Sequence, residues 1–91
     1  MEEVGNLQIE IDEIDSKIVS LLRERFIRSR QIGTIKKRES LPLWDPDRVT
    51  SQREQFIEKC VHANIDPGMA HRLISLLIDQ VIAERNPLEQ I

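Results

Sequence analysis

Groups that covalent or metal chemistry requires are scarce in this sequence. It contains one cysteine, Cys60, which excludes a disulfide within the chain and any cysteine-based metal site. The two histidines, His62 and His71, have no further ligand at metal-site spacing, and we expect both on helix surfaces. A Gly-rich phosphate loop and a Gly-x-Ser-x-Gly elbow are also missing. We therefore expect no metal, no cofactor and no covalent catalysis, and we expect Cys60 to be a half-buried helix residue.

Long apolar runs and an excess of positive charge are absent as well. No segment approaches the roughly 18 uninterrupted apolar residues of a membrane-spanning helix. The acidic start Met1-Glu2-Glu3 lacks the basic and apolar regions of a signal peptide. The formal net charge of -3 argues against a nucleic-acid partner. These features predict a cytoplasmic protein that binds neither membrane nor nucleic acid, folded as one domain over residues 1–91.

Apolar residues at heptad spacing mark the first part of the chain. A period near 3.5 keeps one helix face apolar, so the pattern predicts one helix from about residue 4 to 39. Such a helix is roughly 50 Å long, whereas a compact monomer of this length has a radius of gyration of only about 12 Å. We therefore expect it to pair with a second chain. The row consists of Val4, Leu7, Ile11, Ile14, Ile18, Leu21, Ile32 and Ile35.

Two Asp-Pro pairs predict the starts of two further helices. Asp45 is a suitable N-cap and Pro46 a suitable first helical residue, and Asp66-Pro67 repeats this signal. We expect the second helix to break at 63–65 and the third to close at Asn86-Pro87. No run of residues suggests a strand. The predicted class is all-α, with three helices per chain and a long first helix.

Cations interrupt the apolar row and recur near the second helix. Arg25 and Lys36 are eleven residues apart, close to three full turns, and therefore share a helix face. Arg28 lies one turn from Arg25, and Arg48 falls in the first turn of the second helix. This arrangement indicates a pocket for a small dianion within a helical dimer, without identifying the reaction. Trp44 is expected to pack over the joint between the helices.

Structural explanations for these cations remain open at this point. Arg25 can be an arginine at the edge of the apolar row, or the partner of Glu24 or Asp79 in an ion pair between helices. The basic run 36–38 can be a solvated helix end that complements the negative pole of the helix dipole. Arg85, near the end of the third helix, can likewise be a solvated cation at the negative pole of the helix dipole.

Four segments together form a specific pattern. They are Ile11-Asp12-Glu13-Ile14-Asp15, Leu21-Leu22-Arg23-Glu24-Arg25, Ile32-Gly33-Thr34-Ile35-Lys36 and Leu41-Pro42-Leu43-Trp44-Asp45-Pro46-Asp47-Arg48. Through these segments the sequence resembles the all-helical class of chorismate mutases over nearly its whole length. The resemblance implies an intertwined homodimer in which the long first helices pair and the two active sites are shared between subunits. It also implies the Claisen rearrangement of chorismate to prephenate, a step in aromatic amino acid biosynthesis, without a cofactor.

The resemblance also implies roles for individual residues. Arg25 and Arg48 match carboxylate-binding arginines, which suit the substrate because the planar guanidinium pairs with a carboxylate through two hydrogen bonds. Lys36 matches a lysine that reaches a carboxylate and the ether oxygen, where negative charge grows as the bond breaks. Asp45 matches the residue whose backbone meets the ring hydroxyl.

Four positions depart from the usual family pattern. Gln8 stands where the second subunit commonly lends an arginine, and Arg85 stands where a glutamine or glutamate commonly faces the ether oxygen. Val49 replaces a glutamate that accepts from the C4 hydroxyl, and Val81 replaces a serine. We expect Arg25, Lys36 and Arg85 to be catalytic, all eight residues to line the substrate site, and polar contacts to the substrate ring to be fewer.

These departures keep other functions open. Isochorismate pyruvate lyases share the fold and have an acid-Arg-Val sequence at the start of the second helix, as here, but carry the arginine near position 8 and the glutamine near position 85. A mutase for 4-amino-4-deoxychorismate is a further alternative, because the changes cluster around the C4 substituent. A catalytically silent regulatory dimer is the non-enzymatic alternative. The sequence also leaves open feedback regulation and whether the domain is free-standing or part of a fusion.

Overall fold

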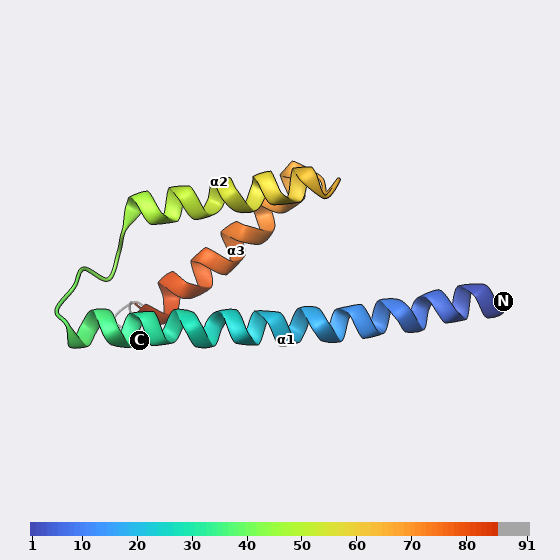
Figure 1. Cartoon of the computed structure of the whole chain (residues 1–91), viewed down its shortest axis with the longest axis horizontal. Coiled ribbons are helices and arrows are strands. Elements are labelled where there is room, and N and C mark those ends of the chain that lie inside the picture. Colours follow the sequence, from blue (N-terminus) through green and yellow to red (C-terminus); the bar gives the residue numbers. More distant parts are fainter. Residues whose placement is uncertain (86–91) are drawn as a thin grey trace. The chain divides into compact units, whose positions relative to one another are not determined.

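The chain folds into three α-helices. The computed structural model describes residues 1–85, and these contain α1 (Glu2–Arg38), α2 (Pro46–His62) and α3 (Pro67–Arg85) with no strand among them (Figure 1). This confirms the predicted all-α class with a long first helix. The expected end of the third helix at Asn86-Pro87 lies outside the described residues.

The chain divides into two compact units, and the boundary falls in the C-terminal part of α1. The N-terminal unit is Met1–Thr34, and the C-terminal unit is Ile35–Ile91. The C-terminal unit begins with the last turn of α1 and contains both shorter helices. In the described part of the chain, no helix is both long and apolar enough to cross a membrane.

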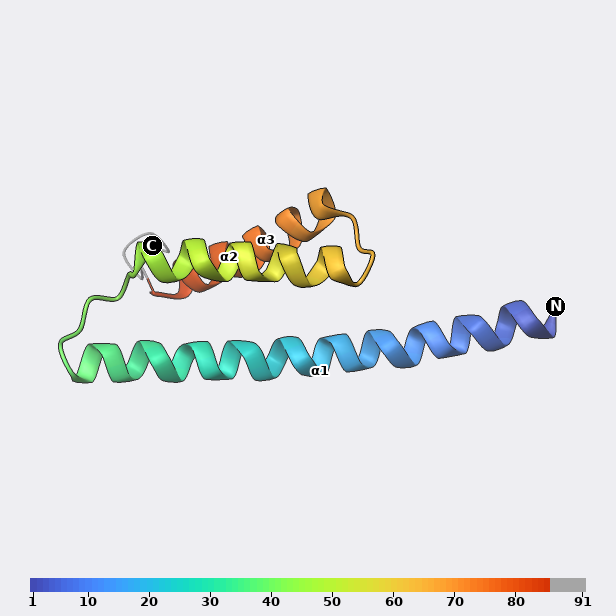
Figure 2. The ribbon, with the colours of Figure 1, turned by 45° about the horizontal axis from the view of Figure 1, so that its top comes forward.

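The apolar row of α1 is left open to solvent in the single chain. α1 runs without interruption from Glu2 to Arg38 (Figure 2), and none of its residues is buried. The eight heptad residues from Val4 to Ile35 keep between 44% and 62% of their surface exposed. Two glutamates in the first turn and the basic run in the last turn complement the helix dipole.

α1 ends in a Schellman motif. The backbone N–H of Leu41 donates to the carbonyl of Lys36 at 2.7 Å, and that of Ser40 donates to the carbonyl of Lys37 at 3.3 Å. Ser40 adopts a φ of 55°, the left-handed conformation that this motif requires. The helix therefore stops before Pro42, at a residue that is not the usual glycine.

Asp45 starts α2 as predicted. Its Oδ1 accepts a hydrogen bond from the backbone N–H of Arg48 at 3.1 Å, and Pro46 occupies the first helical position. At the other end, the N–H groups of Asn64 and Ile65 donate to Val61 and Cys60 in a second Schellman motif, with Asn64 at a φ of 61°. This places the break within the predicted stretch 63–65.

α2 and α3 pack against each other within the C-terminal unit. Asp66 caps α3 by accepting from the N–H of Met69 at 2.9 Å, which confirms the second Asp-Pro start. Arg53 on α2 donates to the hydroxyl of Ser75 on α3. The buried side chains, Cys60, Ala70, Ile74, Leu77 and Ile78, all come from these two helices. Because the small Cys60 joins this core at 8% exposure, the expectation of a half-buried residue was wrong, whereas the two histidines are exposed as expected.

Candidate active site

The C-terminal unit contains most of the residues predicted to line the substrate site. Two of the eight, Gln8 and Arg25, belong to the N-terminal unit. Gln8 is exposed and Arg25 is half-buried on α1. The other six belong to the C-terminal unit: Lys36, Asp45, Arg48, Val49, Val81 and Arg85.

Lys36 lies in the last turn of α1, directly before the helix ends. Its side chain is half-buried, and its carbonyl accepts the hydrogen bond from Leu41 that closes the Schellman motif. The backbone at Lys36 is therefore fixed by the helix on one side and by the cap on the other. The neighbouring Lys37 has the same charge and is exposed.

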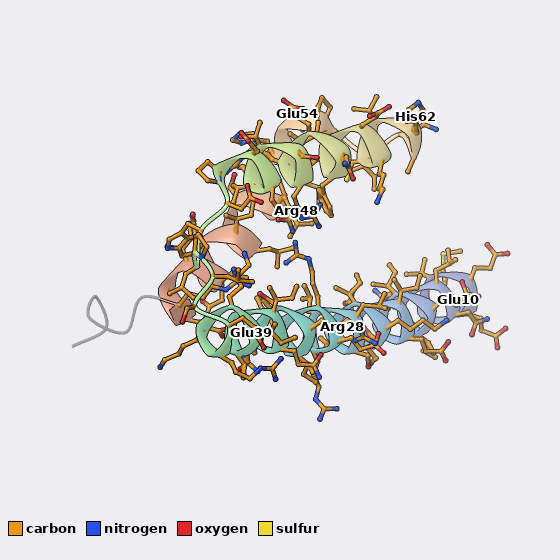
Figure 3. All side chains as sticks on the ribbon, turned by 60° about the vertical axis from the view of Figure 1, so that its left-hand side comes forward. Glu10, Arg28, Glu39, Arg48, Glu54 and His62 are labelled. Atoms are coloured by element: carbon orange, nitrogen blue, oxygen red, sulfur yellow. The ribbon has the colours of Figure 1, made fainter. Side chains whose placement is uncertain are left out.

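Arg28, the second arginine in the apolar row, faces solvent. Its Nη1 donates to the carbonyl of Glu24, one turn earlier in α1, at 3.2 Å. Figure 3 labels Arg28 on α1 together with Arg48 in the first turn of α2. The Arg28 guanidinium therefore bonds back to its own helix, which leaves it less suited to reach a ligand.

Asp45 and Arg48 form one local unit at the start of α2. The carboxylate of Asp45 is engaged by the backbone N–H of Arg48, and its carbonyl accepts from the N–H of Val49 at 3.1 Å. The Arg48 side chain is exposed and therefore accessible to an anion, while Val49 is half-buried beside it. The cap thus fixes the backbone position from which the Arg48 side chain extends.

Arg85 is held by the connector between α1 and α2. Its Nη1 donates to the carbonyl of Leu43 at 3.4 Å, and its Cζ lies 5.8 Å from the centroid of the Trp44 ring. This distance is within the range of a cation–π contact. Both Arg85 and Trp44 are half-buried, so the guanidinium is not the fully solvated cation of the alternative interpretation.

The contact between Arg85 and the connector was not predicted from the sequence. Trp44 was expected to cover the joint between helices, and nothing in the sequence links it to a residue at the end of α3. Leu43 and Arg85 are 42 positions apart, and no periodicity connects residues across such a separation. The available signal was chemical: Trp44 is the sole tryptophan, and it precedes a helix cap within the predicted site.

The cationic side chains of this unit are of the kind that binds anions. Lys36, Arg48 and Arg85 supply three cations from one compact unit, and arginine donors suit carboxylate geometry. No group of three or more histidine, cysteine, aspartate or glutamate side chains within residues 1–85 is arranged to hold a metal ion. The half-buried Val49 and Val81 contribute apolar surface where the family pattern has polar groups.

Comparison with known proteins gives a consistent family. The sequence profile of the family described as chorismate mutase type II matches residues 7–86. A chorismate mutase of Methanocaldococcus jannaschii is 28% identical over 79 residues, which cover 87% of this chain and 80% of that protein. A bifunctional chorismate mutase/prephenate dehydratase of Aquifex aeolicus is 44% identical over 64 residues, covering 70% of this chain but 17% of that protein. No solved structure gives a significant match.

Proposed function

This chain belongs to the chorismate mutase type II family, and we propose that it catalyses the Claisen rearrangement of chorismate to prephenate in the cytoplasm. The family match over residues 7–86 is the observation that carries this proposal. The related chorismate mutase of M. jannaschii, which this chain matches over most of both lengths, supports it.

The rearrangement is intramolecular, so the protein's task is to position the substrate and to stabilise charge. A flexible dicarboxylate must be held in the chair conformation from which the new carbon–carbon bond forms as the ether bond breaks. Arg25 and Arg48 bind the two carboxylates through paired N–H donors. Lys36 contacts a carboxylate and the ether oxygen, where its charge counts most as the transition state develops.

Arg85 takes the position from which a side chain faces the ether oxygen. An arginine presents five N–H donors, so the bond from Nη1 to Leu43 does not exhaust its capacity. In this layout Gln8, contributed by the partner chain, takes the position of the arginine that the family commonly uses. The site keeps its number of cations and changes their order along the substrate.

An intertwined homodimer is part of this proposal. The exposed heptad row of α1 is a long apolar strip that a single chain leaves in water. A second exposed apolar strip lies on α3 at Met69, Leu73 and Leu76, with the spacing of one helix face. We propose that residues 1–91 form one domain whose α1 pairs with that of a second copy, and that each active site receives Gln8 from the partner chain.

Val49 and Val81 favour a second candidate, a different chorismate-derived substrate on the same fold. Both are half-buried, and neither can bond a hydroxyl at C4 of the ring. Isochorismate carries its hydroxyl at C2, and 4-amino-4-deoxychorismate has an amine at C4. The candidate reactions are a pyruvate lyase and an amino-substrate mutase, respectively.

Incubation with three substrates decides between these activities. The purified chain is given chorismate, isochorismate or 4-amino-4-deoxychorismate, and products are identified by chromatography and mass spectrometry. We expect prephenate from chorismate, with the highest kcat/KM of the three. Turnover of isochorismate with release of pyruvate would replace the proposed function by the lyase, and no turnover of any substrate would favour a silent regulatory dimer.

A further inference from the structure

The segment 43–45 touches both predicted site arginines of the C-terminal unit. Its first two residues contact Arg85, through the carbonyl of Leu43 and the ring of Trp44. Its last residue, Asp45, accepts from the backbone of Arg48. Three consecutive residues therefore contact two arginines from different helices, the side chain of Arg85 and the backbone of Arg48.

We infer that Trp44 is a positioning residue for Arg85 in the rearrangement. This inference rests on the proposed function, because it assumes that Arg85 acts on the substrate. The planar guanidinium stacks on aromatic faces, and the attraction comes from the electron-rich face of the indole. A ring against the guanidinium and a carbonyl bonded to Nη1 restrain the group in two ways. These contacts restrain the guanidinium before substrate binds.

The chemical character of these two partners matters for a dianionic substrate. An indole ring and a backbone carbonyl are uncharged, so neither cancels the charge of Arg85 as a carboxylate partner would. These two contacts orient the guanidinium without themselves neutralising its charge. Donors that are already oriented need no reorganisation when charge develops on the ether oxygen. Trp44 thus acts through Arg85 and makes no contact with the reacting atoms.

Two substitutions of Trp44 test this role in the full-length protein. Trp44→Leu removes the aromatic face, and we expect kcat to fall about two- to fivefold, the size of one cation–π contact, while KM changes little. Trp44→Phe keeps an aromatic face and should restore most of kcat. Leu41→Ala, at an exposed position of the same connector, is the matched control and should leave kcat unchanged.

A double-mutant cycle separates positioning from packing. In the Arg85→Gln background, Trp44→Leu should have no further effect on kcat, because the side chain that it positions is gone. If Trp44 only packs the connector, Trp44→Leu lowers kcat by the same factor in both backgrounds. That additive result would overturn the inference.

A spectroscopic measurement tests the contact without any substrate. A guanidinium over an indole face experiences a ring-current shift, so the Nε–H resonance of Arg85 should move when Trp44 is changed to Leu but not in the Leu41→Ala control. Trp44 is the sole tryptophan, and its fluorescence should also change in Arg85→Gln. An unmoved Arg85 resonance would overturn the inference even in an active enzyme. A moved resonance without turnover of any substrate would overturn the proposed function and, with it, the positioning role.

Discussion

The carboxylate of Asp45 accepts a hydrogen bond from the backbone N–H of Arg48 at 3.1 Å. The residue that starts α2 therefore also fixes the residue proposed to bind a substrate carboxylate. Asp66 caps α3 in the same way, through the N–H of Met69, and is also followed by proline. The chain thus contains two similar caps, of which one lies beside the proposed site.

Removing either cap should cost stability, but only one should affect catalysis. Asp45→Ala and Asp66→Ala are each expected to lower the free energy of unfolding by about 1 kcal/mol, the usual contribution of an N-cap. Asp45→Ala should also raise KM, because the first turn that presents Arg48 is loosened. Asp45→Asn, an equally good cap, should keep stability. Denaturant unfolding and steady-state kinetics give both values, and an equal rise in KM for Asp66→Ala would contradict the link.

Lys36 should be required for turnover, whereas Lys37 should not. Truncating a group that pairs with the bound dianion removes roughly 2 to 5 kcal/mol of recognition, and for Lys36→Ala we expect the loss mainly in kcat. Lys37→Ala changes the same charge at an exposed neighbouring position and serves as the control. Circular dichroism should show both variants folded. An undiminished kcat in Lys36→Ala would remove this residue from the mechanism.

Arg85 and Gln8 should be energetically coupled. Arg85→Gln alone should reduce kcat/KM, because Gln8 cannot supply the missing cation. The double variant Gln8→Arg with Arg85→Gln should recover part of the activity by restoring the usual layout of the family. We expect a coupling free energy above about 1 kcal/mol, beyond the additivity of independent sites. An additive cycle with an unchanged kcat/KM in Arg85→Gln would instead describe an arginine without a catalytic role.

The exposed row of α1 should be the dimer interface. Sedimentation equilibrium at micromolar concentration should give a dimer, and Ile14→Asp should unfold the chain, because folding and association then bury the same surface. Ile9→Asp is the control: Ile9 is also exposed on α1 but lies off the heptad row, so its substitution should cost much less. A stable folded monomer at this concentration would rule out an obligate dimer.

The two left-handed residues at the helix ends should respond differently to glycine. Ser40→Gly should raise the free energy of unfolding, by about 0.5 to 1 kcal/mol, because it relieves the left-handed strain of a residue with a Cβ. Asn64→Gly should give a smaller gain, since asparagine tolerates this conformation better. Ala63, next to Asn64 but at a φ of -92°, provides the control. Ala63→Gly should be destabilising, and thermal unfolding of the three variants gives the order.

Local features of the fold were readable from the sequence. The starts of α2 and α3 depend on a capping side chain and a proline next to each other, and the length of α1 depends on a regular apolar period. Both signals lie within a few residues of the feature that they determine. The left-handed cap at Ser40 was not predicted, because glycine is the usual residue in this conformation and serine does not indicate it.

The candidate site was predictable only in part. Residue types at the positions matching the family pattern gave the eight candidates, and the structure assigns six of them to one compact unit. The contact between Arg85 and Trp44 depends on how α3 packs on α2, which no local pattern encodes. The proposed cover of the apolar row on α1 is a second chain, and the sequence of one chain predicts the need for such a partner without giving the geometry.

The hydrogen bond between Arg53 and Ser75 constrains how long the two shorter helices can be. Leu43 lies ten residues before Arg53, and Arg85 lies ten residues after Ser75. The Arg53–Ser75 and Arg85–Leu43 contacts are therefore separated by the same number of residues on both antiparallel segments. One residue inserted on one side alone would turn the following helix by about 100° and advance it by about 1.5 Å. Arg85 would then no longer lie over Trp44. Length changes in α2 and α3 should therefore be tolerated only when both helices change by the same number of whole turns.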